Sequence, residues 1–155
     1  MRIRLRPYHP TWVVAFFGAG GPQAGHNRRG FEYVMDAIRR DPDVEIELVE
    51  DYDDICERCD WCLESKEGSV WGKGHTCRTA QNPVSVESVQ TANRQVLERL
   101  GLHSGSVIRF RDLVELLAER IPDLGQSGIA EIGSPKRQDQ YAKGIAVLRA
   151  LWMRG

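Results

Sequence analysis

The sequence predicts an α+β protein, mostly helical, with a small two- or three-stranded sheet and a cysteine-rich metal-binding loop. Three observations lead to this class. Two short segments alternate strictly between apolar and polar residues, which is typical of strands with one buried face. Four longer segments carry apolar residues at helical spacing. All four cysteines fall within 22 consecutive residues.

Composition limits the classes of protein that fit. The chain has 155 residues, 41% hydrophobic and 28% charged, so we expect a single domain over 1–155. A net charge of −1 argues against a nucleic-acid-binding role, and no apolar run is long enough to span a membrane. Residues 1–20 loosely resemble a secretory signal, but Pro7, His9 and Pro10 interrupt it. Cysteines at metal-ligand spacing favour the cytoplasm.

Residues 1–50 are predicted to form a strand, two helices and a second strand. The strands are 2–6 and 44–49. If they pair, their apolar residues share one face, and arginine meets glutamate on the other. The first helix, 11–17, is apolar all round and therefore buried, and the second covers 26–40.

Glycine residues between these two helices predict a plain loop. The spacing matches neither G-x-G-x-x-G nor a P-loop, so we expect no nucleotide there. The glycines are Gly18, Gly20, Gly21 and Gly25.

Residues 84–122 are predicted to form two helices, over 85–100 and 111–121, because each carries an apolar stripe. Residues 123–136 are rich in Gly, Ser and Pro and are predicted to be a linker or long loop. The last helix, 137–153, has a five-residue apolar face, which we expect to close the core.

The segment 51–83 holds the candidate site. Cys56, Cys59 and Cys62 are each separated by two residues, and Cys77 follows fourteen residues later. Three cysteines at consecutive x2 spacings are typical of loops that wrap three corners of a cubane cluster, and a remote cysteine closes the fourth. The sequence therefore predicts a [4Fe–4S] cluster held by these four cysteines.

Other chemistries remain open for this segment. Zinc takes four Cys or His ligands, but a zinc ribbon would supply a second C-x2-C pair, which is missing. A redox-active dithiol at Cys56 and Cys59 would need a helix directly afterwards. His75 is an alternate ligand or an ordinary loop residue. His9 either approaches the site or caps the helix that begins near Thr11.

The surroundings of the cysteines are acidic and aromatic. Residues 50–67 contain eight acids and two bases, a net charge of −6, which predicts a low reduction potential for a bound cluster. This acidic segment either docks a basic partner or is an ordinary solvated loop. Asp53 and Asp54 are interpreted as ordinary surface acids without a catalytic role. Trp61 and Trp71 either shield the cluster or belong to the core.

Two motifs together carry a resemblance to a known family. They are Arg4-Leu5-Arg6-Pro7 with His9, and Asp53-Asp54-Ile55-Cys56-x2-Cys59. In these residues the chain resembles a prokaryotic family, the domain of unknown function 1284, which is described as iron–sulfur binding. The resemblance covers about residues 2–120 and leaves the last helix outside it.

The chain departs from this family at several positions. Members typically have histidine where Tyr8 stands and cysteine where Trp12 stands, and they follow the second cysteine with Pro-His, where Asp60-Trp61 stands here. Cys62 is additional, and our hypothesis from the resemblance is that a cysteine ligand is lost at position 12 and gained at position 62. The resemblance supports Cys56, Cys59 and Cys77, and Cys62 rests on spacing alone. The family offers no established activity.

Three functions therefore compete. We favour a small soluble iron–sulfur protein that transfers electrons or acts as an accessory protein, with a protein redox partner. The alternatives are a zinc-stabilised interaction domain and an enzyme that uses an iron–sulfur cluster without redox change. No Ser-His-Asp or H-E-x-x-H signature appears, which argues against an enzyme.

Overall fold

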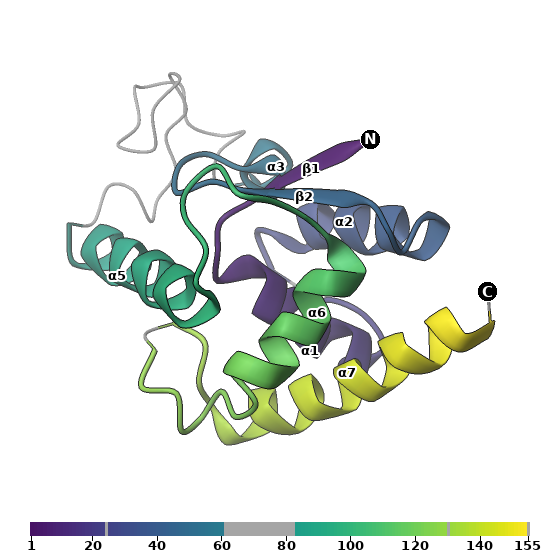
Figure 1. The fold of residues 1–155 in the computed structure, drawn as a ribbon. Coiled ribbons are helices and arrows are strands. Elements are labelled where there is room, and N and C mark those ends of the chain that lie inside the picture. The colour runs from purple at the N-terminus through teal and green to yellow at the C-terminus, as the bar shows by residue number, and fades with distance from the viewer. Residues whose placement is uncertain (24, 61–82, 130, 155) are drawn as a thin grey trace.

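A computed structural model describes residues 1–23, 25–60, 83–129 and 131–154. The fold is α+β, as predicted, with helices predominating and three short strands in one mixed sheet (Figure 1). The elements in chain order are β1 (Arg2–Leu5), α1 (His9–Ala19), α2 (Arg28–Arg40), β2 (Glu45–Leu48), α3 (Asp54–Glu57), α5 (Pro83–Leu100), β3 (Val107–Arg109), α6 (Phe110–Arg120) and α7 (Pro135–Arg154).

The sheet is built around β2. β1 pairs parallel with one side of β2, and β3 pairs antiparallel with the other side. Arg2 stands opposite Glu45, with side-chain atoms 3.3 Å apart, and Arg4 stands opposite Glu47. The expected pairing of arginine with glutamate is therefore confirmed. The apolar partners on the other face are all fully buried: Ile3, Leu5, Ile46 and Leu48.

β3 is a strand that the sequence did not single out. Its three residues are exposed or half-buried, so they show no buried alternation that would mark a strand. The turn before it fixes its position, because the Leu48 N–H donates to the Ser106 carbonyl at 2.9 Å and the Gly105 N–H donates to the Leu48 carbonyl at 2.7 Å. Gly105 has a φ of +90°, which glycine adopts without strain.

α1 is buried on nearly every side, as its apolar sequence predicted. α7 packs closely across it (Figure 1). Gly18 and Gly144 allow this approach, because a Cβ on Gly144 would lie 1.8 Å from the Val14 carbonyl oxygen. Gly18 was expected in the loop, which was wrong. Its Cβ position would lie 1.9 Å from the Gln140 carbonyl oxygen, and it lies inside the helix.

The other helices agree with the sequence to within a few residues. α2 begins at Arg28 rather than at residue 26, and α5, α6 and α7 each begin one or two residues earlier than predicted. The apolar face of α7 closes the core through Tyr141, Ile145 and Leu148, all buried. None of the helices in the described ranges is long and apolar enough to cross a membrane.

The segment between α6 and α7 folds onto the rest of the molecule. Leu124, Ile129 and Ile132 are buried in the core cluster. The Tyr141 hydroxyl donates to the Ile121 carbonyl at 2.9 Å and fastens α7 to the end of α6. Of the linker or long loop predicted for this segment, the described residues show a loop that is packed against the core.

Candidate functional site

A short turn of helix presents the first two cysteines. α3 begins after Asp53, whose carboxylate accepts the N–H groups of Ile55 at 3.1 Å and Cys56 at 3.0 Å, a standard N-cap. The Cys59 N–H then donates to the Cys56 carbonyl at 3.1 Å. Both cysteines are buried, with 3% and 6% exposure, and neither forms a disulfide.

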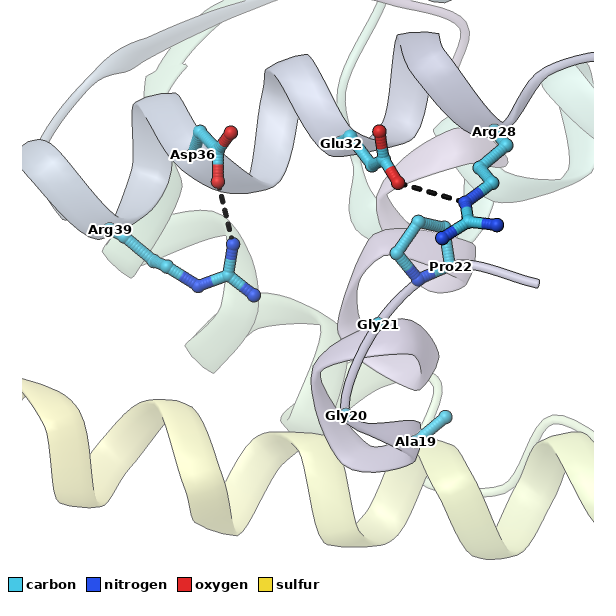
Figure 2. Close-up of a pocket in the computed structure, with 8 residues that line it drawn as sticks. All are labelled: Ala19, Gly20, Gly21, Pro22, Arg28, Glu32, Asp36 and Arg39. Atoms are coloured by element: carbon cyan, nitrogen blue, oxygen red, sulfur yellow. Dashed lines mark hydrogen bonds and ion pairs between the residues drawn. The ribbon is translucent and has the colours of Figure 1, made fainter. Parts of the chain in front are cut away.

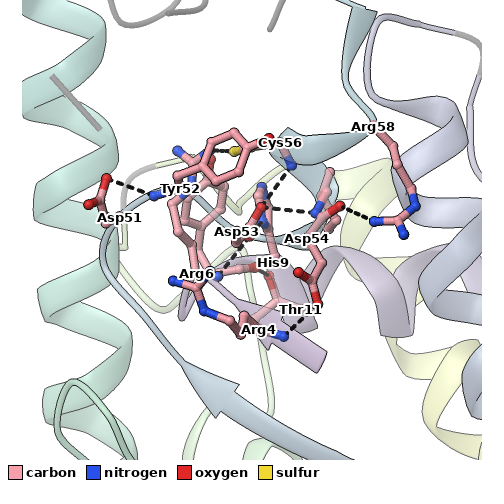
Figure 3. Close-up of polar contacts among 12 residues, drawn as sticks. Arg4, Arg6, His9, Thr11, Asp51, Tyr52, Asp53, Asp54, Cys56 and Arg58 are labelled. Atoms are coloured by element: carbon pink, nitrogen blue, oxygen red, sulfur yellow. Dashed lines mark hydrogen bonds and ion pairs between the residues drawn. The ribbon is translucent and has the colours of Figure 1, made fainter. Parts of the chain in front are cut away.

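The two aspartates before Cys56 also cover the edge of the sheet. The Arg4 N–H donates to Asp54 at 2.9 Å, and the Arg6 N–H donates to Asp53 at 2.8 Å (Figure 3). Such N–H groups on an edge strand would otherwise lack partners. Asp53 is fully buried, so its interpretation as a surface acid was wrong. The motif holds α3 against β1.

His9 completes the environment of Asp53. Its Nδ1 lies 2.5 Å from the Asp53 carboxylate, and both side chains are buried. Burial lowers the pKa of His9 despite the attraction of Asp53, so a neutral imidazole donates this bond. Burial would raise the pKa of Asp53, but His9 and Arg6 outweigh it and hold that pKa well below its usual range.

His9 therefore lies within the site's hydrogen-bond network and does not cap α1. It is the first residue of α1, whose N-cap is Tyr8, and the Tyr8 side chain makes no capping hydrogen bond. Of the two roles that the sequence left open for His9, the structure supports the approach to the site.

Arg6 brings a positive charge to the first cysteine. Its Nη2 donates to the Cys56 sulfur at 2.5 Å, and the residue is only 6% exposed (Figure 3). Burial disfavours the charged guanidinium, but attraction to Tyr8, Cys56 and Asp53 outweighs burial and raises the pKa of Arg6. Arg6 therefore stays charged beside the sulfur.

His26 brings a second nitrogen to the second cysteine. Its Nδ1 lies 3.2 Å from the Cys59 sulfur. The backbone carbonyl of His26 accepts the Asp60 N–H at 2.8 Å, and Arg29 forms an ion pair with Asp60. The sequence analysis missed this residue, because only its fold-dependent proximity to Cys59 marks it.

Close packing of α2 against α3 sets the distance between these groups. A Cβ on Gly30 would lie 2.7 Å from the Ile55 carbonyl oxygen, so only glycine fits without a shift. Arg58 reinforces the contact, because it donates to the Asp54 carbonyl at 3.1 Å and stacks 3.5 Å from the Tyr33 ring centroid.

The other candidate residues lie outside the described part of the chain. In residues 1–23, 25–60, 83–129 and 131–154, no three His, Cys, Asp or Glu side chains gather closely enough to hold a metal ion. The structure brings Arg6 close to Cys56, and it brings His26 close to Cys59. The candidates outside these ranges are Cys62, Cys77, His75, Trp61 and Trp71.

A pocket of about 530 Å³ lies apart from the cysteines, between the end of α1 and the outer face of α2 (Figure 2). Gly20 ends α1 there with a φ of +87°. The charged lining residues pair with one another, Arg28 with Glu32 at 2.8 Å and Arg39 with Asp36 at 2.8 Å. Because these charges are already neutralised, we assign this pocket no ligand.

Fold and site together define a small α+β protein with a buried turn of two cysteines, each with a side-chain nitrogen close to its sulfur. The chain belongs to the family described as "Protein of unknown function (DUF1284)", whose model matches residues 28–128. The match includes all four cysteines but not Arg6, His9 or His26, so it begins later than the resemblance from about residue 2 suggested. No curated protein and no solved structure matches the chain.

Proposed function

We propose that this chain is a small iron–sulfur protein that transfers electrons or serves as an accessory protein to a redox partner in the cytoplasm. The observation that carries the proposal is the pair of buried cysteines on one turn, each with a side-chain nitrogen close to its sulfur. Burial protects a thiolate centre from water, and N–H groups at the sulfurs offset its negative charge.

The chemistry of the described residues fits a cluster of this kind. Thiolates are the ligands that iron–sulfur clusters require, and hydrogen bonds to the sulfurs tune their potentials. Arg6 donates to Cys56, and His26 lies beside Cys59. A bound cluster would supply one-electron transfer, and the chain would exclude water and stabilise the added charge.

The full ligand set of the proposal is Cys56, Cys59, Cys62 and Cys77. Cys56 and Cys59 lie in the described turn. Cys62 is included because of its x2 spacing from Cys59, and Cys77 is included because the resemblance supports it. The structural role of the described residues is to fix the first pair. The Asp53 cap, the edge of β1 and the contact at Gly30 all hold that turn in place.

The contacts also modify the expectation of a low potential. Asp53 is one of the eight acids counted near the cysteines, but it is buried, and its carboxylate accepts hydrogen bonds from His9 and from the Arg6 backbone N–H. Arg6 adds a positive charge directly at a sulfur. The potential of the proposed cluster should therefore lie higher than the acidic composition alone suggests.

Zinc is the second candidate, and the Cys59–His26 pair is the observation that favours it. Zinc sites commonly combine thiolate sulfur with imidazole nitrogen. In that case the metal would stabilise an interaction domain, and no electron would be transferred. The presence or absence of acid-labile sulfide separates the two candidates.

The test is the visible spectrum of the full chain purified without oxygen, compared with Cys56→Ala and Cys59→Ala. The proposal predicts a broad band near 400 nm in the wild type that dithionite bleaches, and its loss in both variants. Circular dichroism checks that the variants keep their helices. A colourless wild-type chain, or cysteine variants with an unchanged band, would rule out the proposed cluster.

A further inference from the structure

The helix α7 packs one side against the core and leaves the opposite side exposed. α1 lies against the inner side, and α7 runs along one edge of the molecule (Figure 1). Val147 and Met153 are exposed on this helix, at 38% and 88%, and they are two of the four large apolar side chains exposed in the described ranges. Ala146 and Ala150 are exposed on the same side. α7 thus carries an apolar surface that faces water.

Opposite charges flank this apolar surface at its two ends. Asp139 precedes it and Arg154 follows it, both are exposed, and neither has an ion-pair partner among the described residues. The two are fifteen residues apart, which is close to four helical turns, so they lie on the same side of α7 as the alanines. We call the side that holds Asp139, Ala146, Val147, Ala150 and Arg154 the outer face.

The outer face is complementary to itself when two copies of α7 run antiparallel. A two-fold axis through the midpoint between Ala146 and Val147 places Asp139 opposite Arg154 of the second copy, at both ends of the contact. The side chains near the axis are small, so the two helices can approach to about 8–10 Å. Lys143 then meets Ala150 of the second copy, and its aliphatic stem lies along that alanine while its charge stays in water.

We propose that the outer face of α7 docks a second copy of this chain. A second copy supplies the acid and the base that the first copy leaves unpaired, and it covers apolar side chains on both helices. The net charge of −1 adds little repulsion between copies. One helix face is small beside the interfaces of permanent dimers, so the dimer should be weak and depend on concentration. The inference does not rest on the proposed cluster, because α7 and the cysteine turn are separate elements.

Sedimentation equilibrium of the full chain, purified without oxygen and examined between about 10 µM and 1 mM, tests this inference. We expect the average mass to rise with concentration from 17.5 kDa toward twice that value. Asp139→Arg and Arg154→Asp should each raise the dissociation constant by about tenfold, because two exposed attractive pairs become repulsive. The double variant Asp139→Arg with Arg154→Asp exchanges the two charges, so it should restore the dimer.

The matched control is Glu87→Arg, which makes the same change of charge at an exposed acid of α5 and should leave the dissociation constant unchanged. Circular dichroism checks that every variant keeps its helices. A wild-type chain that stays at the monomer mass at every concentration would overturn the inference. A dimer that both single reversals leave intact, or that the double variant fails to restore, would show that the outer face of α7 is not the contact. Neither result would affect the proposed cluster.

Discussion

At the scale of single residues, Arg6 is the charge that the site depends on most directly. It donates to the Cys56 sulfur from a buried position, and a positive charge there stabilises an added electron. Arg6→Gln should therefore shift the reduction potential to a more negative value, by tens of millivolts. Arg6→Lys keeps the charge and should shift the potential less. A redox titration followed by electron paramagnetic resonance measures both, and equal potentials in folded Arg6→Gln and wild type would contradict this role.

His9 should make the stability of the protein depend on pH. Burial lowers its pKa from 6.5, so the unfolded chain takes up this proton at a higher pH than the folded chain. The free energy of unfolding should then be highest above pH 6.5 and fall as the pH decreases toward the lower pKa of folded His9. Asp53, whose pKa is also lowered, adds a further loss below about pH 4.

Denaturant unfolding between pH 7.5 and 5 measures the effect of His9. His9→Asn can still donate to Asp53 but does not titrate, so its free energy of unfolding should change less over this range. The exposed His103 provides the matched control, and His103→Asn should behave like the wild type. Equal slopes in the wild type and His9→Asn would show that His9 does not cause the dependence.

Residue types and spacing indicated Cys56 and Cys59 and left open that His9 approaches them, but they did not predict the other groups around these cysteines. Cys56 and Cys59 are recognisable because their separation is local in the sequence. Asp53 lies 47 residues from Arg6, whose N–H it accepts directly after β1, and His26 lies 33 residues from Cys59. No local pattern encodes such contacts, because they arise only when the chain folds.

At the scale of elements, Gly30 determines how closely α2 approaches α3. Gly30→Ala would place a methyl group 2.7 Å from the Ile55 carbonyl oxygen. The helices must separate, so we expect a loss of about 1–3 kcal/mol in the free energy of unfolding. The shift should also move Cys56 and lower the iron content of the purified chain.

The matched control for this change is Gly25→Ala. A Cβ there meets only the Asn27 side chain at 3.9 Å, and the position has no positive φ. Thermal unfolding and iron analysis of both variants test whether Gly30→Ala lowers the stability and the iron content of the chain. If Gly30→Ala were as stable and as rich in iron as Gly25→Ala, the α2–α3 contact would not be what positions the turn.

The elements themselves were largely predictable, and the exceptions have physical causes. Helices with a long apolar stripe, such as α5 and α6, follow from periodicity. β3 has no buried side chain and depends on hydrogen bonds to β2, so its sequence carries little signal. The segment 122–134 has the composition of a linker, yet a few apolar side chains anchor it to the core.

At the scale of the whole molecule, the crossing of α1 and α7 joins the two ends of the chain. Gly144→Ala would place a methyl group 1.8 Å from the Val14 carbonyl oxygen, inside this crossing. We expect the free energy of unfolding to fall by an amount near the upper end of about 1–3 kcal/mol. Each kcal/mol lost should lower the melting temperature by roughly 2–4 °C. Lys143→Ala, on the exposed side of α7, should leave the melting temperature nearly unchanged.

This crossing also bears on the site, although it lies outside the family match over 28–128. α1 begins with His9, which bonds Asp53, and α7 covers the buried face of α1. Loss of α7 contacts should therefore loosen the cysteine turn as well as the core. A Gly144→Ala chain with an unchanged melting temperature would contradict the structural importance of the crossing.

The central claim is that the cysteine turn holds an iron–sulfur cluster. The most direct measurement is the content of iron, acid-labile sulfide and zinc in the full chain purified without oxygen. The account predicts iron and sulfide in equal amounts, about four of each per chain. One zinc per chain without sulfide, or a chain free of metal, would contradict it.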